Sequence, residues 1–231
     1  MFSLSGCSDK NDENQVSTAN LENVAKEEEM PEKGSFDARV AEFNEVYKKA
    51  LLTTGQGKTE EAAATAKQAD DLWIKIFNDF VNNPPKEYRG TEDWVEKMKG
   101  LSSLVMEADE KVGQGDLEEA HEKLETVRKN LKELRAENKI RSISDDMLAF
   151  HDVMEEITAM ESRAEAEQRM ADLKITFTVL KEYNEGDAKY EEMVKKLENV
   201  ISEVDTSTEE NFKEKRDKLK PAFIALYMMF G

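Results

Sequence analysis

Apolar side chains recur every three or four positions along most of this chain, and that spacing constrains its fold more than any other feature. Such a period puts apolar groups on one face of an α-helix, whereas a half-buried strand alternates. In the stretch 59–82, for example, one stripe holds Ala62, Ala66, Ala69, Leu72, Trp73, Ile76, Phe77 and Phe80. Glycine and proline number only 10 and 4 among 231 residues, so turns are scarce. The pattern therefore predicts an all-α protein of amphipathic helices.

Start and stop signals divide the chain into eight expected helices, in two series of four. Ser35 and Asp116 are expected N-caps, because short polar side chains accept hydrogen bonds from the first helical turn. Pro84 should end the second helix, and Pro221 should kink or restart the eighth. The first four expected helices cover about 35–54, 59–82, 91–113 (with Thr91 as its cap), and from 116 to a turn near 138–143. The second four begin near 144, cover about 164–184 and 187–204, and end with a helix that starts at the capping box Ser207-Thr208-Glu209-Glu210.

Three stretches of the first series match three of the second in the same order. Trp94–Asp109 aligns with Tyr190–Asp205 without a gap, and Phe43–Val46 aligns with Phe150–Val153. In the last helix of each series, three of four pairs keep apolar character when Ala120, Leu124, Val127 and Leu131 are set against Phe212, Arg216, Leu219 and Phe223. Amphipathic helices also agree by chance, but agreement in a fixed order favours duplication. We predict two related up-down four-helix units, residues 35–140 and 141–231.

The N-terminal residues Leu4-Ser5-Gly6-Cys7 resemble a bacterial lipobox, the end of a lipoprotein signal peptide. In that family an apolar residue, two small residues and a cysteine form the processing site, and the cysteine is lipidated. The resemblance implies that residues 1–7 are the remnant of a signal peptide and that Cys7 anchors the protein to a membrane. Only three residues precede the box, whereas a full signal has an apolar stretch of about 7–15. Either the true start lies upstream or the match is accidental.

Residues 8–34 are polar and acidic, with no aromatic residue and no sustained apolar period. Such a composition predicts a disordered tether. A lipidated cysteine, a tether and a folded body are the usual order in lipoproteins, so the resemblance implies a cell-envelope protein facing the periplasm. If the lipobox is accidental, we expect a cytoplasmic protein instead.

Charge and missing motifs exclude several classes of function. The formal net charge is −18, which repels phosphate backbones and makes nucleic-acid binding improbable. The single cysteine excludes an intrachain disulfide framework. The sequence lacks a glycine-rich phosphate loop, a Gly-x-Ser-x-Gly elbow and a His-Glu-x-x-His motif. We therefore expect a binding protein rather than an enzyme.

The two histidines, His121 and His151, are the candidate metal ligands. Glu118 and Glu125 share a helix face with His121, and Glu155 follows His151 by four residues, so a divalent metal could bind either group. If the fourth and fifth helices form a hairpin, an axial gap of about 13 Å separates the histidines. That gap argues against one joint site. Surface or hydrogen-bonded histidines are the simpler interpretation.

Met147, His151 and Met154 fall at i, i+4 and i+7 and so share another helix face. Thioether and imidazole groups suit copper(I), or non-covalent haem in a four-helix bundle. Methionines at helical spacing more often fill an apolar core. We expect no cofactor on this basis and keep metal, copper or haem as the alternatives.

Three arginines, Arg128, Arg135 and Arg141, lie between the two series. They could bind an anion, but in so acidic a chain pairing with carboxylates is the default expectation. The last segment, Pro221–Phe230, is apolar on all faces and too short to span a bilayer. We expect a buried helix there, or a contact surface for an envelope protein or a second protomer.

These features together predict a lipid-anchored envelope protein that binds a protein partner or a small ligand. In outline the expected architecture resembles periplasmic four-helix bundles of the cytochrome c-prime type. The chain lacks their Cys-x-x-Cys-His haem motif, so their redox role is not implied. The alternative function is metal or haem binding through His121 or His151.

Overall fold

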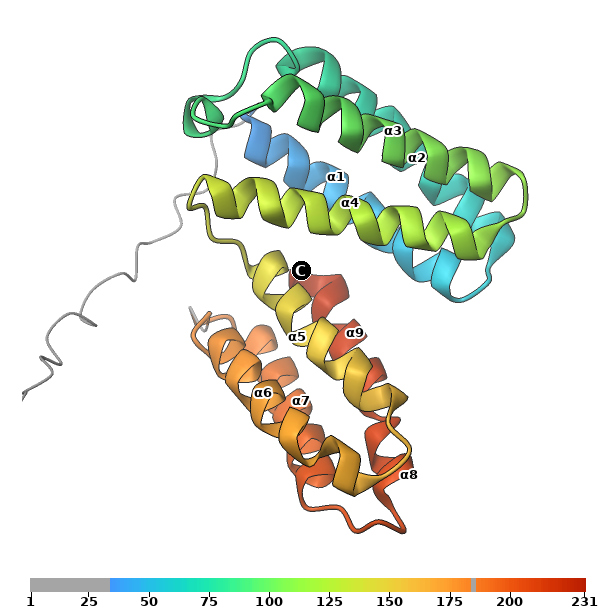
Figure 1. Ribbon diagram of the computed structural model, residues 1–231, viewed down its shortest axis with the longest axis vertical. Helices are drawn as coiled ribbons and strands as arrows, with labels where there is room; N and C mark the ends of the chain where they lie inside the picture. The colour runs from blue at the N-terminus through green and yellow to red at the C-terminus, as the bar shows by residue number, and fades with distance from the viewer. Residues whose placement is uncertain (1–33, 184–185) are drawn as a thin grey trace, which may run out of the picture.

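The computed structural model describes residues 34–183 and 186–231 of the protein (Figure 1). Within these residues the chain forms nine α-helices, one short 3-10 helix and no strand, which confirms the all-α prediction. The predicted lipobox and the predicted acidic tether, apart from its last residue Gly34, lie outside the described residues. The helices are α1 (Phe36–Gly55), α2 (Thr59–Phe80), η1 (Lys86–Tyr88), α3 (Trp94–Gly113), α4 (Leu117–Glu137), α5 (Ile143–Ala159), α6 (Arg163–Lys181), α7 (Ala188–Asp205), α8 (Phe212–Arg216) and α9 (Leu219–Phe230).

Helices α1 to α4 form an up-down-up-down bundle in which each helix packs against two neighbours (Figure 1). Ser35 caps α1 by accepting a hydrogen bond from the Ala38 amide at 3.2 Å, as predicted. Asp116 caps α4 by accepting from the Glu119 amide, also at 3.2 Å. The apolar stripes meet inside, where the rings of Phe43 and Trp73 lie 5.1 Å apart. This bundle therefore closes around its own apolar core.

The second bundle is built from α5, α6, α7 and α9, with the short α8 leading into α9. Its core contains Phe150 and Phe223, whose rings stack with centroids 5.4 Å apart. Residues 175–179 alternate apolar and polar side chains as a strand does, but they are helical, as predicted for the range 164–184. Ser162 and Glu165 form a capping box at the start of α6. Two related four-helix units therefore follow one another along the chain.

The third helix of each bundle begins in the same way. Trp94 and Tyr190 are both buried at the first turn of that helix. The Trp94 indole donates to the Phe80 carbonyl at 2.9 Å, and the Tyr190 hydroxyl donates to the Leu180 carbonyl at 2.6 Å. Each acceptor lies at the C-terminal end of the bundle's second helix, where carbonyls lack helical partners. This shared hydrogen bond, from an aromatic side chain of the third helix to the end of the second, supports the predicted duplication.

The start of the last helix differs from the prediction. Ser207 does not begin a helix, because its hydroxyl donates to the Val204 carbonyl at 2.6 Å and helps to end α7. The Thr208 amide donates to the Asn211 side chain at 2.9 Å, and α8 begins only at Phe212. Thr91 likewise does not cap α3, since its hydroxyl accepts from the Asn138 side chain. Pro221 lies in the first turn of α9, which confirms the predicted restart.

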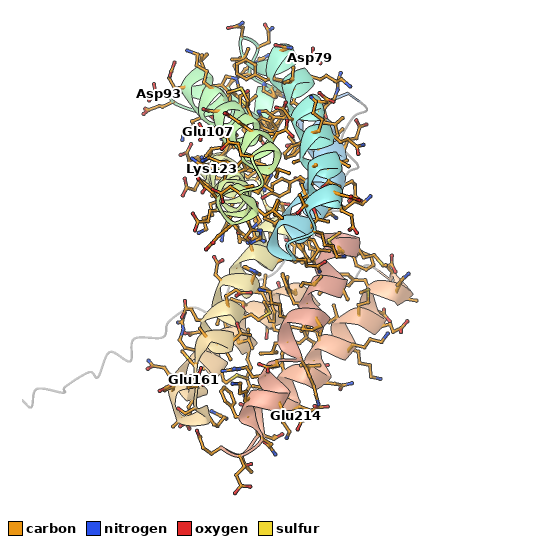
Figure 2. The ribbon with its side chains drawn as sticks, turned by 90° about the vertical axis from the view of Figure 1, so that its right-hand side faces the viewer. Asp79, Asp93, Glu107, Lys123, Glu161 and Glu214 are labelled. Carbon is orange, nitrogen blue, oxygen red and sulfur yellow. The ribbon has the colours of Figure 1, made fainter. Side chains whose placement is uncertain are left out.

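The two bundles are stacked with their long axes crossed (Figure 1). Figure 2 shows Asp79 and Asp93 at one end of the molecule and Glu161 and Glu214 at the other. The two large apolar clusters are separate, and close helix-on-helix packing stays within each bundle. Helices α4 and α5 do not form a hairpin, the condition under which the two histidines were placed far apart, because α5 leaves α4 and runs into the other bundle. Each described helix is too short or too polar to cross a bilayer.

Candidate functional site

A pocket of about 590 Å³ lies at the junction of the two bundles. The C-terminal end of α1 and the N-terminal half of α4 form one wall, and α9 with one residue of α5 forms the other. Its lining combines apolar side chains with charged ones. The lining residues include Lys48, Leu51, Leu52, Glu118, His121, Glu122, Glu125, Arg128, His151, Lys220, Phe223, Ile224, Tyr227 and Met228.

His121 is held against the end of α1. Its Nδ1 atom lies 3.1 Å from the Thr54 hydroxyl and 3.1 Å from the Leu51 carbonyl oxygen. A carbonyl only accepts, so a proton on Nδ1 completes this bond and leaves Nε2 facing Glu125, 3.8 Å away. A Cβ atom at Gly55 would lie 3.0 Å from the ring, so the glycine makes room for the imidazole. The Thr54 hydroxyl, the Leu51 carbonyl and the space at Gly55 thus orient His121 within the first bundle.

Arg128 connects α4, the helix of His121, with His151 on α5. It is only 6% exposed, and its Nη2 atom donates both to the Glu125 carboxylate and, at 3.3 Å, to Nδ1 of His151. Burial opposes the charge, but the Glu125 carboxylate raises the pKa of Arg128 above its ordinary value. The guanidinium therefore stays charged. His151 accepts through Nδ1, so its Nε2 faces Glu155 at 3.5 Å.

Lys48 is a second buried cation at the junction, only 1% exposed. Its ammonium group donates to the Gly231 carbonyl at 2.7 Å and to the Met228 carbonyl at 3.5 Å. The Glu45 carboxylate lies 2.9 Å from the same nitrogen. Lys48 therefore fastens the end of α9 to α1, across the boundary between the bundles.

Two buried tyrosines, Tyr47 and Tyr227, lie near Arg128 at the junction. The Tyr47 hydroxyl donates to the Leu124 carbonyl at 2.5 Å, within the first bundle. The Tyr227 ring comes from α9, with its centroid 5.9 Å from the Arg128 guanidinium carbon. Burial raises the pKa of both phenols, so both hydroxyls remain protonated near neutral pH.

The three arginines between the bundles pair with carboxylates, which confirms the default expectation. Arg128 pairs with Glu125 on its own helix. Arg135 binds Asp145 through a two-pronged fork, with Nε at 2.8 Å and Nη2 at 2.5 Å from the two carboxylate oxygens. Arg141 lies 3.0 Å from Asp146. The Arg135 fork connects α4 to α5 beyond the turn and so fixes where the second bundle starts.

The structure brings most of the predicted metal ligands to one place. His121, His151, Glu118 and Glu125 all line the pocket, although the hairpin estimate had argued against a joint site. Glu155 lies beside His151, and its carboxylate is 2.9 Å from the Lys220 ammonium. In the described part of the chain, no three His, Cys, Asp or Glu side chains are grouped as a metal site.

The predicted copper or haem residues divide between two environments. Met147 and Met154 are fully buried in the apolar core of the second bundle and do not line the pocket. His151, from the same helix, faces the pocket, and its ring lies 5.6 Å from that of Phe223. Leu148 lies three residues before His151 and is buried without belonging to either large core. One face of α5 thus serves the core, and another serves the junction.

Sequence analysis did not identify Lys48, Lys220 or Tyr227 as parts of the site. Lys48 follows Tyr47 at the border of the apolar face of its helix, where a lysine is expected to extend into solvent. Its burial depends on carbonyls about 180 residues away in the chain. A local sequence pattern holds no signal for such a contact.

Comparisons with protein-family models, curated proteins and solved structures give no match to this chain.

Replacing Lys48 by methionine should loosen the end of α9. The substitution leaves the Gly231 and Met228 carbonyls without their charged donor, and we expect the free energy of unfolding to fall by about 1–3 kcal/mol. Hydrogen exchange should rise in α9 more than in α2 or α3. Lys49→Met is the matched control, because Lys49 is exposed and its change should stay within about 0.5 kcal/mol. Equal stability of both variants would show that the Lys48 contacts do not hold the junction.

Proposed function

We propose that this chain is a lipid-anchored cell-envelope protein that binds a small organic ligand in the pocket between its two bundles. The observation that carries the proposal is the pocket itself, with its mixture of apolar walls and buried polar groups. Small-molecule sites typically measure about 300–1,000 Å³ and combine apolar walls with a few oriented polar groups. The junction pocket, at about 590 Å³, has both properties.

A ligand site suits this fold because the junction is not an apolar core. Arg128, His121 and His151 are oriented by hydrogen bonds to partners that come from both bundles. Their positions are therefore fixed before a ligand arrives, which lowers the entropy lost on binding. The segment Pro221–Phe230 supports this role rather than docking of a large partner, since Phe223, Leu226 and Tyr227 are already buried.

The lipid anchor rests on the four residues Leu4–Cys7 and on the acidic stretch that follows them. Several acyl chains on one cysteine would hold the protein at a membrane, which a single chain does only weakly. The net charge of −18 disfavours contact between the folded body and an acidic lipid surface, and the tether would keep the two apart.

Filling the pocket should weaken binding of a neutral probe. We expect N-phenyl-1-naphthylamine to bind the full chain with one site and enhanced fluorescence. Ile224→Trp should weaken binding at least tenfold, because Ile224 lines the pocket and is only partly buried. Ala225→Trp is the control, since the neighbouring Ala225 is exposed and does not line the pocket. Absence of binding to the wild-type chain, or equal loss in both variants, would contradict the proposal.

Lipidation should depend on Cys7. When the gene is expressed in a bacterium with its native upstream DNA, an alkyne-labelled palmitate should label the protein and the protein should sediment with membranes. Cys7→Ser should remove both the label and the membrane association, whereas Ser8→Ala should keep them. Labelling of the Cys7→Ser variant, or an unlabelled wild-type protein, would exclude the anchor.

A divalent metal is the second candidate ligand, because His121, His151, Glu118 and Glu125 line the same pocket. Purified protein titrated with Zn²⁺ or Ni²⁺ should then bind one ion, and His121→Ala and His151→Ala should each weaken binding about tenfold or more. A stoichiometry far below one, or no response to either substitution, would remove this candidate.

A further inference from the structure

We infer that the pocket selects a singly charged organic acid, whose carboxylate binds the Nε/Nη2 edge of Arg128 while its apolar body lies against α9. This inference rests on the proposed function and names the class of ligand. Arg128, a buried arginine, has an Nε donor without a partner in the described part of the chain.

Arg128 and Arg135 use the same edge of the guanidinium in different ways. In Arg135 both Nε and Nη2 donate to Asp145, which fills the fork. In Arg128 Nη2 donates to Glu125 and to His151, and the guanidinium is also hydrogen-bonded to the Tyr227 hydroxyl, while the buried Nε has no acceptor among the described residues. A buried donor without a partner is unfavourable, because it has lost its hydrogen bond to water. The fork of Arg128 is therefore half filled at a position that lines a pocket.

Glu125 leaves the fork half filled because of its place in the sequence. It lies three residues before Arg128 on the same helix, and its other oxygen faces His121 Nε2 at 3.8 Å. A carboxylate from outside the helix can approach the edge in plane, the geometry in which two parallel hydrogen bonds form. A ligand can thus complete the fork when Glu125 releases Nη2.

The walls around Arg128 define the rest of the ligand. Leu51, Leu52, Phe223, Ile224 and Met228 supply apolar surface from α1 and α9. Glu118 and Glu122 are exposed and also line the pocket, so they repel additional negative charge. An anion with one charge and an apolar body fits these walls, whereas a phosphate dianion does not.

The second buried cation does not compete for this role. Lys48 already contacts the carbonyls of Gly231 and Met228 and the Glu45 carboxylate. An ammonium group has three N–H donors, and three acceptors surround this one. Arg128 is therefore the group with donor capacity to spare.

The test measures displacement of N-phenyl-1-naphthylamine from the full chain by ligands that differ only in their head group. We expect 4-phenylbutyrate to displace the probe at least tenfold more effectively than 4-phenylbutan-1-ol, and more effectively than 4-phenylbutyl phosphate. The preference for the acid should fall to about one in Arg128→Met. It should persist in Arg216→Met, a matched control, because Arg216 is equally buried but lies in the second bundle outside the pocket.

A second variant keeps the inference testable if Arg128→Met fails to fold, which circular dichroism would show. Glu125→Gln removes the competing charge and should strengthen acid binding several-fold without affecting the alcohol. Equal displacement by acid and alcohol, stronger displacement by the phosphate, or weaker acid binding in Glu125→Gln would overturn the inference while the proposed function stood. Failure of the wild-type chain to bind the neutral probe would instead overturn the proposed function, and the inference with it.

Discussion

Burial of one apolar stripe per helix is the constraint on which the rest of this structure depends. The stripes close in two sets, one around Phe43 and Trp73 and the other around Phe150 and Phe223. Each set of stripes is buried within a bundle of about a hundred residues, so little apolar surface remains to join the bundles. Buried cations with acceptors in the opposite bundle therefore take a large part in joining the two bundles.

A polar junction has consequences that an apolar one would not have. Removing Lys48 and Arg128 from water is unfavourable unless their donors find acceptors, and these acceptors lie in the opposite bundle or on the same helix. Such pairs hold a defined angle but do not fill space as leucine or phenylalanine does. A pocket with oriented polar groups remains between the bundles. The same shortage of apolar surface thus explains both the crossed arrangement and the candidate site.

Local chemistry made much of the fold predictable. The caps Ser35 and Asp116, the restart at Pro221 and the helical character around Ile175 follow from interactions within a few residues. The prediction that the last helix begins at Ser207 was wrong, because a serine can end one helix as well as begin another. The pocket was not predictable, since the angle between bundles depends on Lys48 reaching Gly231 and Arg128 reaching His151. Both histidines were recognised as candidates, but the assumed hairpin of α4 and α5 placed them too far apart.

Hydrogen exchange on a Phe150→Ala variant tests most directly whether the two bundles fold around separate cores. Phe150 is fully buried in the second core, and its truncation should remove about 3–5 kcal/mol of stability. We expect exchange to rise across α5, α6, α7 and α9 while α1 to α4 keep their protection, apart from residues at the junction. An equal rise in both bundles would mean that they unfold as one unit, and would contradict the account of two cores joined through polar contacts.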